Sequence, residues 1–251
     1  MKSLFLSICF LAFSLNSIIA DEIVLVADFW PPFFDIQNTD NPGYAVELSR
    51  EIFTAAGHTV KFEIVPWSRA VDGTSTGLYS AAIGAFDGDV PGAILPTESI
   101  GFSTNTFFVK KGDSWRYSGI SSLAKKRVGL IQDYNYDYGD FDKWAATTKE
   151  VGWMAGDEAL FTNLRMLVAG RLDAIIDDSN VIIYLAKQKN LLSQIEPAGI
   201  LGEKAPLYIA FSGKQPKGKE YAKIFSEGLA ALRKNGKLTL ILAKYGMKDW
   251  K

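Results

Sequence analysis

The sequence is poor in the side chains that hold metals or carry out thiol chemistry. Among its 251 residues there is one cysteine, Cys9, and one histidine, His58. A zinc site, or a nucleophile activated by a histidine base, needs several such groups in one place. We therefore expect no metal, no cofactor and no enzymatic activity of this kind. His58 follows Gly57 and is expected to lie in a solvated turn.

The chain also has no excess of positive charge. Lysine and arginine number 27 against 28 aspartates and glutamates, which gives a net charge of -1. A surface that binds a phosphate backbone needs a basic excess, so nucleic acid is excluded as an expected partner. With 48% hydrophobic and 22% charged residues, the composition is that of a globular protein.

Long apolar runs are scarce, and one stands at the beginning. Residues 4–13 are apolar, they follow the positive Lys2, and Ala20 precedes the acidic Asp21 and Glu22. This order is typical of a signal peptide, and the run is shorter than the roughly 20 residues that span a bilayer. We expect residues 1–20 to be removed together with Cys9, leaving a soluble periplasmic protein. A membrane anchor is the alternative.

The hydrophobic pattern predicts two α/β units in succession. The first has strands at 23–27, 60–65 and 81–85, with helices at 45–55 and from about residue 68. The second has strands at 127–131, 151–154 and 172–176, with helices at 158–169 and 181–187. An extended segment at 206–211 and helices at 220–234 and 238–244 follow.

The last two predicted helices, 220–234 and 238–244, need a sheet to pack against. The first unit has fewer helices of its own than the second unit. We therefore predict two lobes, each a mainly parallel sheet flanked by helices. Lobe 1 is assigned to residues 21–109 and 206–251, and lobe 2 to residues 110–205. The two crossings between the lobes are expected near residues 107–110 and 207–210.

Five segments, in this order, resemble the family 3 extracellular solute-binding proteins, the group that binds polar amino acids. They are ADFWPPFF (27–34), GYAVELSREIFTAAG (43–57), VPWSRA (65–70), LVAGRLDAIIDDSNV (167–181) and LILAKYGMKDW (240–250). The resemblance implies a monomer of the periplasmic binding protein fold. Its two lobes would close at a hinge around one small molecule and deliver it to a membrane ABC permease or to a sensor.

The resemblance implies that two tryptophans are walls of the ligand site. Trp30 follows the first strand, at the sheet edge where open α/β sheets bind ligands. An aromatic residue at the place of Trp30 covers one face of the ligand in the family, and one at the place of Trp67 covers the other. The alternative is that both indoles lie in the core.

Asp178 matches the family carboxylate that meets the ligand's ammonium group. A charge-assisted hydrogen bond of this kind is stronger than a neutral one. The alternative for Asp178 is a helix N-cap, because Asn180 and Val181 begin a helix. Asp177 points to the other side of the strand by alternation, and Asp173 lies at its beginning, so both are expected to be structural.

Two further loops resemble ligand-binding segments of the family. The first follows the third strand and is Gly84, Ala85, Phe86 and Asp87, where Asp87 puts a charge in place of a hydroxyl. The second contains Tyr134, Asn135 and Tyr136, where the family has a small-residue turn that presents amide groups to a carboxylate. The bulkier loop in this chain is less suited to an anion.

The chain departs from the family at the arginine that binds the α-carboxylate of amino acids. Residues 87–99 contain no arginine. Arg69, close to Trp67, either replaces it or lies on the surface. If Arg69 does not replace it, the expected ligand is an amine without a carboxylate. An exported cyclohexadienyl dehydratase-like enzyme is the enzymatic alternative, and it would need a carboxylic acid of raised pKa beside a carboxylate-binding arginine.

Overall fold

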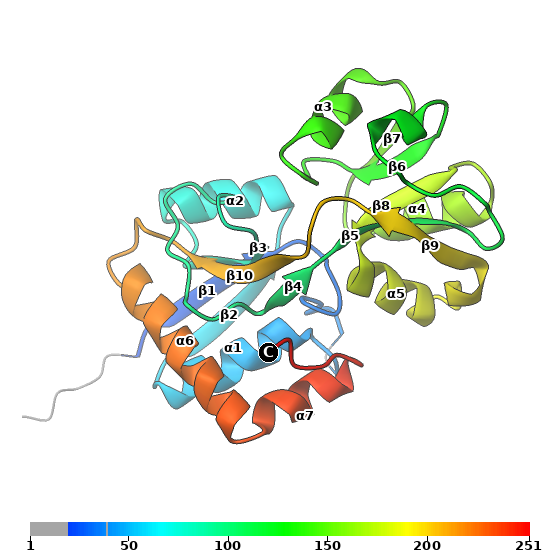
Figure 1. The fold of residues 1–251 in the computed structure, drawn as a ribbon. Coiled ribbons are helices and arrows are strands. Elements are labelled where there is room, and N and C mark those ends of the chain that lie inside the picture. Colours follow the sequence, from blue (N-terminus) through cyan, green and yellow to red (C-terminus); the bar gives the residue numbers. More distant parts are fainter. Residues whose placement is uncertain (1–19, 39) are drawn as a thin grey trace, which may run out of the picture.

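The computed structural model describes residues 20–38 and 40–251, and these form two lobes joined by two strand-like connections (Figure 1). Residues 1–19 of the predicted signal peptide lie outside the described residues. None of the helices in the described part of the chain has the length and apolar character needed to span a bilayer.

The first lobe is built on a five-stranded sheet with the order β2-β1-β3-β10-β4. Strand β1 pairs in parallel with β2 and β3, whereas β10 is antiparallel to β3 and β4. Four of the five strands therefore run in one direction, as predicted. The elements of this lobe are β1 (Glu22–Ala27), α1 (Tyr44–Ala55), β2 (Thr59–Ile64), α2 (Trp67–Thr76), β3 (Ala81–Ala85), β4 (Gly101–Ser103), β10 (Ala205–Phe211), α6 (Gly218–Lys234) and α7 (Lys237–Lys244).

The second lobe repeats this plan with the order β7-β6-β8-β5-β9. Strand β6 is parallel to β7 and β8, and β5 is antiparallel to both of its neighbours. Its elements are β5 (Asn105–Lys110), the 3-10 helix η1 (Ile120–Leu123), β6 (Val128–Ile131), α3 (Asp140–Thr147), β7 (Val151–Met154), α4 (Ala159–Val168), β8 (Ala174–Asp178), α5 (Ser179–Gln188), the 3-10 helix η2 (Leu192–Gln194) and β9 (Ile195–Ile200).

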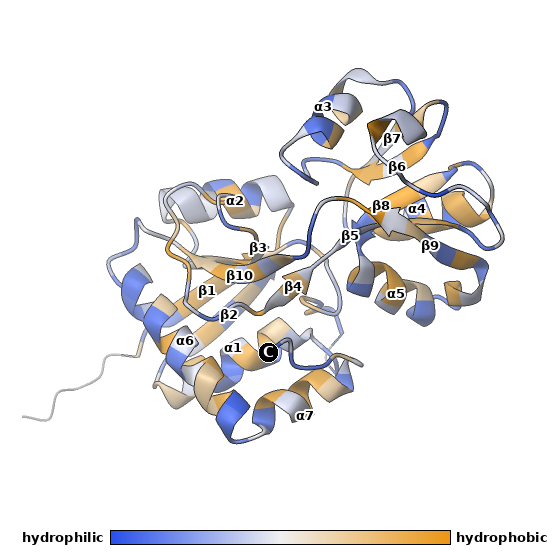
Figure 2. Cartoon of the chain, in the orientation of Figure 1, coloured by the Kyte–Doolittle hydropathy of each residue, from blue (hydrophilic) through white to orange (hydrophobic). Residues whose placement is uncertain are grey.

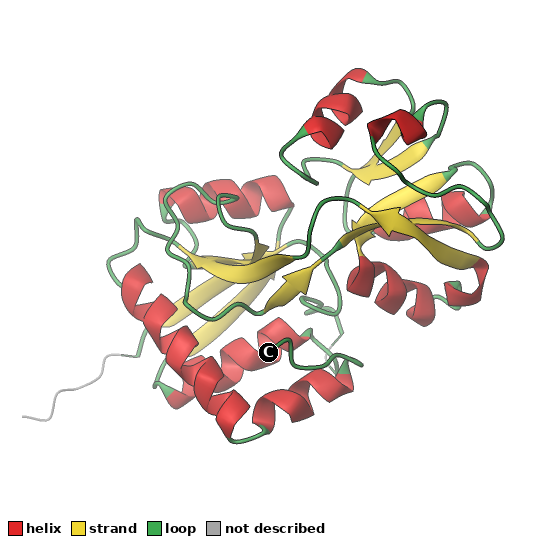
Figure 3. Ribbon diagram, viewed as in Figure 1, coloured by secondary structure: helices red, strands yellow, loops and turns green. Residues whose placement is uncertain are grey.

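Helices cover both faces of each sheet, which explains why central strands such as β3 and β6 are apolar throughout (Figure 3). In β1, Ile23 and Leu25 pack against the layer of α1 and α6, whereas Val26 packs with Ala70 on the α2 side. Helix α6 turns charged side chains outward and apolar ones towards the sheet (Figure 2). This two-sided cover buries the sheet and leaves the strand ends as the accessible edges.

The crossings between the lobes lie elsewhere than the sequence predicted. Strand β5 belongs entirely to the second sheet, so the chain leaves lobe 1 at Thr104 and not after residue 109. It returns through residues 201–204, immediately before β10. The predicted segments 107–110 and 207–210 are apolar because they are central strands, and apolar character alone does not distinguish a crossing from a strand.

Helix α3 and strand β9 have no counterpart in the sequence prediction. The short α3 carries three charged residues and only two buried ones, Phe141 and Ala145, so its apolar period is weak. The prediction for His58 is wrong, because its side chain is buried and packs edge-on against Tyr221 of α6. Only the docking of α6 on this turn removes His58 from solvent.

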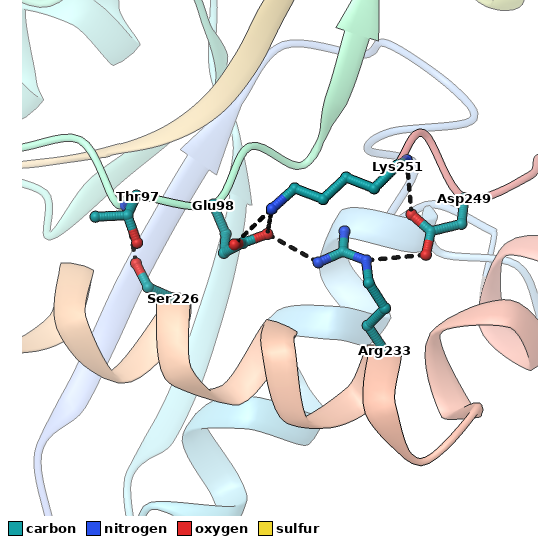
Figure 4. A network of polar contacts seen from close by, with 6 residues as sticks. All are labelled: Thr97, Glu98, Ser226, Arg233, Asp249 and Lys251. Carbon is teal, nitrogen blue, oxygen red and sulfur yellow. Dashed lines mark hydrogen bonds and ion pairs between the residues drawn. The ribbon is translucent and has the colours of Figure 1, made fainter.

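The C-terminal segment is fixed to lobe 1 by a network around Arg233 (Figure 4). The guanidinium of Arg233 donates to Glu98 at 2.8 Å and to Asp249 at 2.9 Å. The ammonium of Lys251 reaches the same Glu98 carboxylate at 2.7 Å. The guanidinium also lies 5.5 Å from the ring centroid of Trp250, so Arg233 holds both the loop before β4 and the chain terminus.

Replacing Arg233 by glutamine should destabilise the protein by about 1–3 kcal/mol, because Asp249 loses its charged partner and Glu98 loses one of its two. Chemical denaturation of the purified protein measures this loss. Lys223→Gln on the same helix is the control, since the Lys223 side chain is 74% exposed and its change should cost less than about 0.5 kcal/mol. Equal effects of the two substitutions would contradict the role assigned to Arg233.

Candidate functional site

The topology places four loops around one cleft. In each sheet the strand order changes direction at one pair of parallel-running strands, β1 and β3 in lobe 1 and β6 and β8 in lobe 2. Open α/β sheets bind ligands beyond the carboxyl ends of such a pair. The segments that follow these four strands face one another between the lobes, so the cleft combines two of these binding edges.

These segments line a central pocket between the lobes. Aromatic and acidic side chains predominate in its wall. The lining residues are Asp28, Trp30, Trp67, Ile83, Gly84, Phe86, Asp89, Asn105, Tyr134, Asn135, Tyr136, Tyr138 and Asp177.

Trp30 is held in a fixed position by lobe 1. Its ring stacks on Phe33 with a centroid distance of 4.5 Å, and Gly84 lies beneath it. Gly84 has a φ of +89°, and a Cβ atom there would be 3.3 Å from the Trp30 ring. Trp67, the first residue of α2, lines the same pocket. The two tryptophans therefore belong to one site.

Asp177, the penultimate residue of β8, is the most deeply buried acid in the pocket wall, with 2% of its surface exposed. The indole Nε1 of Trp30 donates to its Oδ1 at 3.0 Å. Its Oδ2 is buried and has no hydrogen-bond partner among the described residues. Burial, together with the nearby charges of Asp178 and Asp28, raises the pKa of Asp177 to about 7. An unsatisfied buried carboxylate oxygen is costly and is matched best by a charged donor.

Two further carboxylates face the pocket from lobe 1. Asp28 follows β1 and accepts a hydrogen bond from the hydroxyl of Tyr134. Asp89 accepts one from the hydroxyl of Tyr138 and another from the backbone N–H of Phe86 at 2.8 Å. Burial raises the pKa of Asp28 and that of Asp89 to about 6. The pocket therefore carries up to three negative charges near neutral pH.

Four hydrogen bonds among the described residues join the lobes across the cleft, and each has an aspartate carboxylate as acceptor. Trp30, Tyr134 and Tyr138 each donate to an aspartate of the opposite lobe. A fourth bond joins the Ser68 hydroxyl to Asp133 at 3.3 Å. The structure is thus a closed arrangement of the two lobes in which aromatic donors face carboxylate acceptors.

The loop that carries these tyrosines is shaped by two other aspartates. The carboxylate of Asp142 accepts hydrogen bonds from the backbone N–H groups of Tyr136, Asp137 and Tyr138. That of Asp137 accepts from the backbone of residues 139, 141 and 142. These bonds fix the turn between β6 and α3, so the tyrosines are presented by an ordered loop.

The structure places Asp177, and not Asp178, in the pocket wall. Asp178 is 0% exposed and lines none of the three pockets in the cleft. Its carboxylate accepts from the N–H groups of Asn180 and Val181 as the N-cap of α5, and from that of Thr104. The capping alternative describes this geometry, and Asp177 faces the pocket instead. The alternation of side chains along the strand predicted the opposite placement. It fails at this point because β8 ends at Asp178 and the chain turns directly into α5.

Three other predicted site residues lie outside the central pocket. Arg69 is exposed on α2 and lines none of the three cleft pockets, so it is not placed to bind a carboxylate there. Ala85 is buried in the layer beneath α2. Asp87 is exposed and lines an adjoining pocket on the hinge side. The predicted Trp30, Trp67, Gly84, Phe86, Tyr134, Asn135 and Tyr136 come together in the central pocket.

Sequence reasoning did not identify Asp28, Asp89, Asn105 and Tyr138 as members of the site. Asp28 could have been found, because it is the first residue after the β1 strand, at the edge where ligands bind. Asp89 and Tyr138 had no such signal. Each lies in a turn held by hydrogen bonds to the backbone of its own lobe, and the sequence does not show which polar side chains make such bonds.

The pocket wall carries negative charge and aromatic rings. No lysine or arginine belongs to the described residues that line the three cleft pockets. Within the described residues there is also no group of three or more metal-ligating side chains. Carboxylates together with indole and phenol rings attract ammonium groups through charge and through the ring quadrupole.

The chain belongs to the bacterial extracellular solute-binding proteins, family 3, whose family model matches residues 23–248. The fold is similar to that of a histidine kinase sensor domain resembling periplasmic binding proteins, with 24% identity over 91% of this chain and 98% of that one, and a TM-score of 0.72. It is also similar to ArtJ, an arginine-, lysine-, histidine-binding protein of Geobacillus stearothermophilus, at 19% identity, 91% and 97% coverage and a TM-score of 0.72.

A third similar structure comes from a study of glutathione import through GshT and the cystine ABC importer TcyBC of Streptococcus mutans. It shares 18% identity over 92% of this chain and 97% of that one, with a TM-score of 0.76. No curated protein matches the chain.

The raised pKa values predict an unusual pH dependence of stability. Asp28 and Asp177 titrate near 3.8 when unfolded but near 6 and 7 when folded. Between these values the folded state binds more protons, so the free energy of unfolding must fall as the pH rises. From pH 5 to 8 we expect a fall of about 2.7 kcal/mol from Asp177, since the interval from pH 5 to its folded pKa spans about two units and each is worth about 1.4 kcal/mol.

Denaturation of the purified protein at several pH values measures this effect. Asp177→Asn removes one titrating group, and its stability should fall less steeply over the same interval. A stability that rises from pH 5 to 8, or an equal slope in the variant, would contradict the burial assigned to Asp177.

Gly84→Ala should displace the Trp30 ring, whereas Gly88→Ala should not. Both glycines have positive φ, at +89° and +94°, so both substitutions cost about 1–2 kcal/mol in backbone strain. Only the Gly84 Cβ meets the indole, because a Cβ at Gly88 has no atom within 4 Å. The near-ultraviolet circular dichroism of the tryptophans should change in the Gly84 variant alone. Identical spectra would show that Gly84 does not position Trp30.

Proposed function

We propose that this protein is an exported solute-binding protein whose lobes close around a small amine-bearing cation. The observation that carries the proposal is the charge of the central pocket. Three carboxylates face it, one of them with an unpartnered buried oxygen, while no lysine or arginine lies among its described lining residues. An amino acid with a free α-carboxylate would find no cationic partner there.

The closed arrangement indicates how such a ligand would be held. Its ammonium group would take the open acceptor of Asp177, between the rings of Trp30 and Trp67. Periplasmic binding proteins as a class close by hinge motion around their ligands. Here the hinge would be Thr104 and residues 201–204, the two connections between the sheets. Closure would bring the acids of both lobes onto one cation.

We propose delivery to an ABC importer as the downstream step, in the periplasm, in keeping with the family and with the signal-peptide pattern of residues 1–20. A sensor module that acts on a membrane kinase is the second candidate. It is favoured by the similarity to the histidine kinase sensor domain, which spans 91% of the chain. Co-purification with a permease or with a kinase distinguishes the two.

A dehydratase-like enzyme has one supporting feature, the acids of raised pKa in the cleft. The second feature that such an enzyme needs is an arginine beside these acids, and none lies among the described pocket residues. We therefore propose binding without chemistry. Chemical change of a cyclic carboxylic acid on prolonged incubation with the purified protein would overturn this choice.

Small amines should stabilise the protein in a thermal-shift experiment, and succinate and glutarate should not. A ligand that binds only the folded state at 100 times its Kd adds about 2.7 kcal/mol to the free energy of unfolding. Tight binding of a dicarboxylate, without binding of any amine, would refute the proposed ligand class.

Asp177→Asn should weaken amine binding at least about thirty-fold, the equivalent of 2 kcal/mol for a desolvated charge pair. The neighbouring Asp178→Asn is the matched control. Because asparagine caps a helix about as well as aspartate, it should change stability little and leave affinity unchanged. Calorimetric titration measures both. Loss of binding in the Asp178 variant alone would return the ligand contact to Asp178.

A further inference from the structure

The central pocket is the middle of three that adjoin in the cleft. It shares Asn135, Tyr136 and other walls with a hinge-side pocket, which extends to residues 201–206. On the other side it shares Trp30 and Trp67 with an outer pocket at the beginning of α2 and α4. The hinge-side and outer pockets have no residue in common. Together they form an extended groove.

Acidic residues occur along the whole groove. The hinge-side pocket adds Asp87, Asp137 and Glu203 to the three acids of the centre, and the outer pocket adds Asp133 and Asp157. The described lining residues of all three include neither lysine nor arginine. This excess of one charge extends well beyond what a single ammonium group needs.

The acidic side chains of the groove differ in whether hydrogen-bond donors of the protein already bind them. Asp137 is occupied by backbone N–H groups of its own loop. Asp87 and Glu203 are exposed, and no hydrogen bond or ion pair to either is present within the described part of the chain. In the centre, Asp177 keeps one buried oxygen without a partner. The groove therefore has open carboxylate acceptors at two separate places, in the central and the hinge-side pockets.

Between these two places the walls are aromatic. Phe86, Tyr136 and Tyr138 line both the central and the hinge-side pocket. An apolar chain that links two ammonium groups can be buried against such rings, and each buried methylene contributes about 0.8 kcal/mol. A compact ligand would leave this stretch and the hinge-side acids unused.

We propose that the ligand is an elongated amine with two or more separated ammonium groups, a diamine or polyamine, which lies along the groove from Asp177 to Asp87 and Glu203. This inference rests on the proposed function and names its substrate class. One ammonium group binds Asp177 between the tryptophans. The methylene chain passes Tyr136 and Phe86, displacing the Tyr138 hydroxyl from Asp89, and the second ammonium group binds the hinge-side acids.

Calorimetric titration of the purified protein with n-propylamine, putrescine and spermidine tests the proposal. We expect affinity to rise by at least about tenfold from the monoamine to the diamine, and again to the triamine. The double variant Asp87→Asn with Glu203→Gln should lose most of this rise and bind n-propylamine as the parent does. Both residues are exposed, so the fold is retained.

The matched control is Asp140→Asn with Glu227→Gln, which removes the same charge at two exposed side chains outside the groove. It should behave as the parent does. Equal affinity for the three amines, or an undiminished rise in the groove variant, would overturn the elongated ligand while leaving the amine-binding function in place. Binding of none of the amines would refute the proposed function itself.

Discussion

The hydrogen bond from the Trp30 indole to Asp177 is the interaction on which the arrangement of the cleft depends. It joins the loop after β1 to the end of β8 and so connects the two lobes at their binding edges. The second oxygen of Asp177 is buried and has no partner in the part of the chain that the structure describes. A polar atom in that state carries a free-energy cost, which the cationic ligand proposed above would relieve.

The rest of the site supports this contact from both sides. In lobe 1, Phe33 and the glycine at position 84 hold the Trp30 ring against the sheet. In lobe 2, Asp142 binds the backbone of the tyrosine loop, so the phenol groups reach Asp28 and Asp89 from an ordered turn. Some acids of the region therefore shape the loop, while others remain available to a ligand.

Because some of these acids bind the backbone of their own loop and others face the pocket, their roles were hard to assign from the sequence. Asp137, Asp142, Asp177 and Asp178 are identical in chemistry, and the sequence does not show which of them accept backbone N–H groups. Asp178 and Asp142 are satisfied by the chain itself, in an N-cap and in a turn. Asp177, one residue from a cap, accepts the N–H of Asp178 and the indole of Trp30 through one oxygen, and its other oxygen has no partner among the described residues. A difference of one position at the end of β8 separates an acid that caps a helix from one that lines the pocket.

By itself the sequence determined the two α/β units, the direction of most strands and the family. These follow from local hydrophobic period and from short motifs such as the segment around Trp30 and the one before Asp178, which do not depend on distant contacts. Most of the pocket wall could also be placed, because residues that follow buried strands collect at one sheet edge. The positions of Trp30, Trp67, Gly84 and Tyr134 agree with this rule.

Only the tertiary structure decided where the lobes cross, which aspartate faces the cleft and whether an arginine reaches it. Strand β5 looks the same in sequence as a connecting segment, and its pairing partners β8 and β9 lie far along the chain. Arg69 is close to Trp67 in sequence but is exposed on α2, away from the pocket lining. Such outcomes depend on which distant groups meet when the two lobes pack, and local residue patterns carry no information about those meetings.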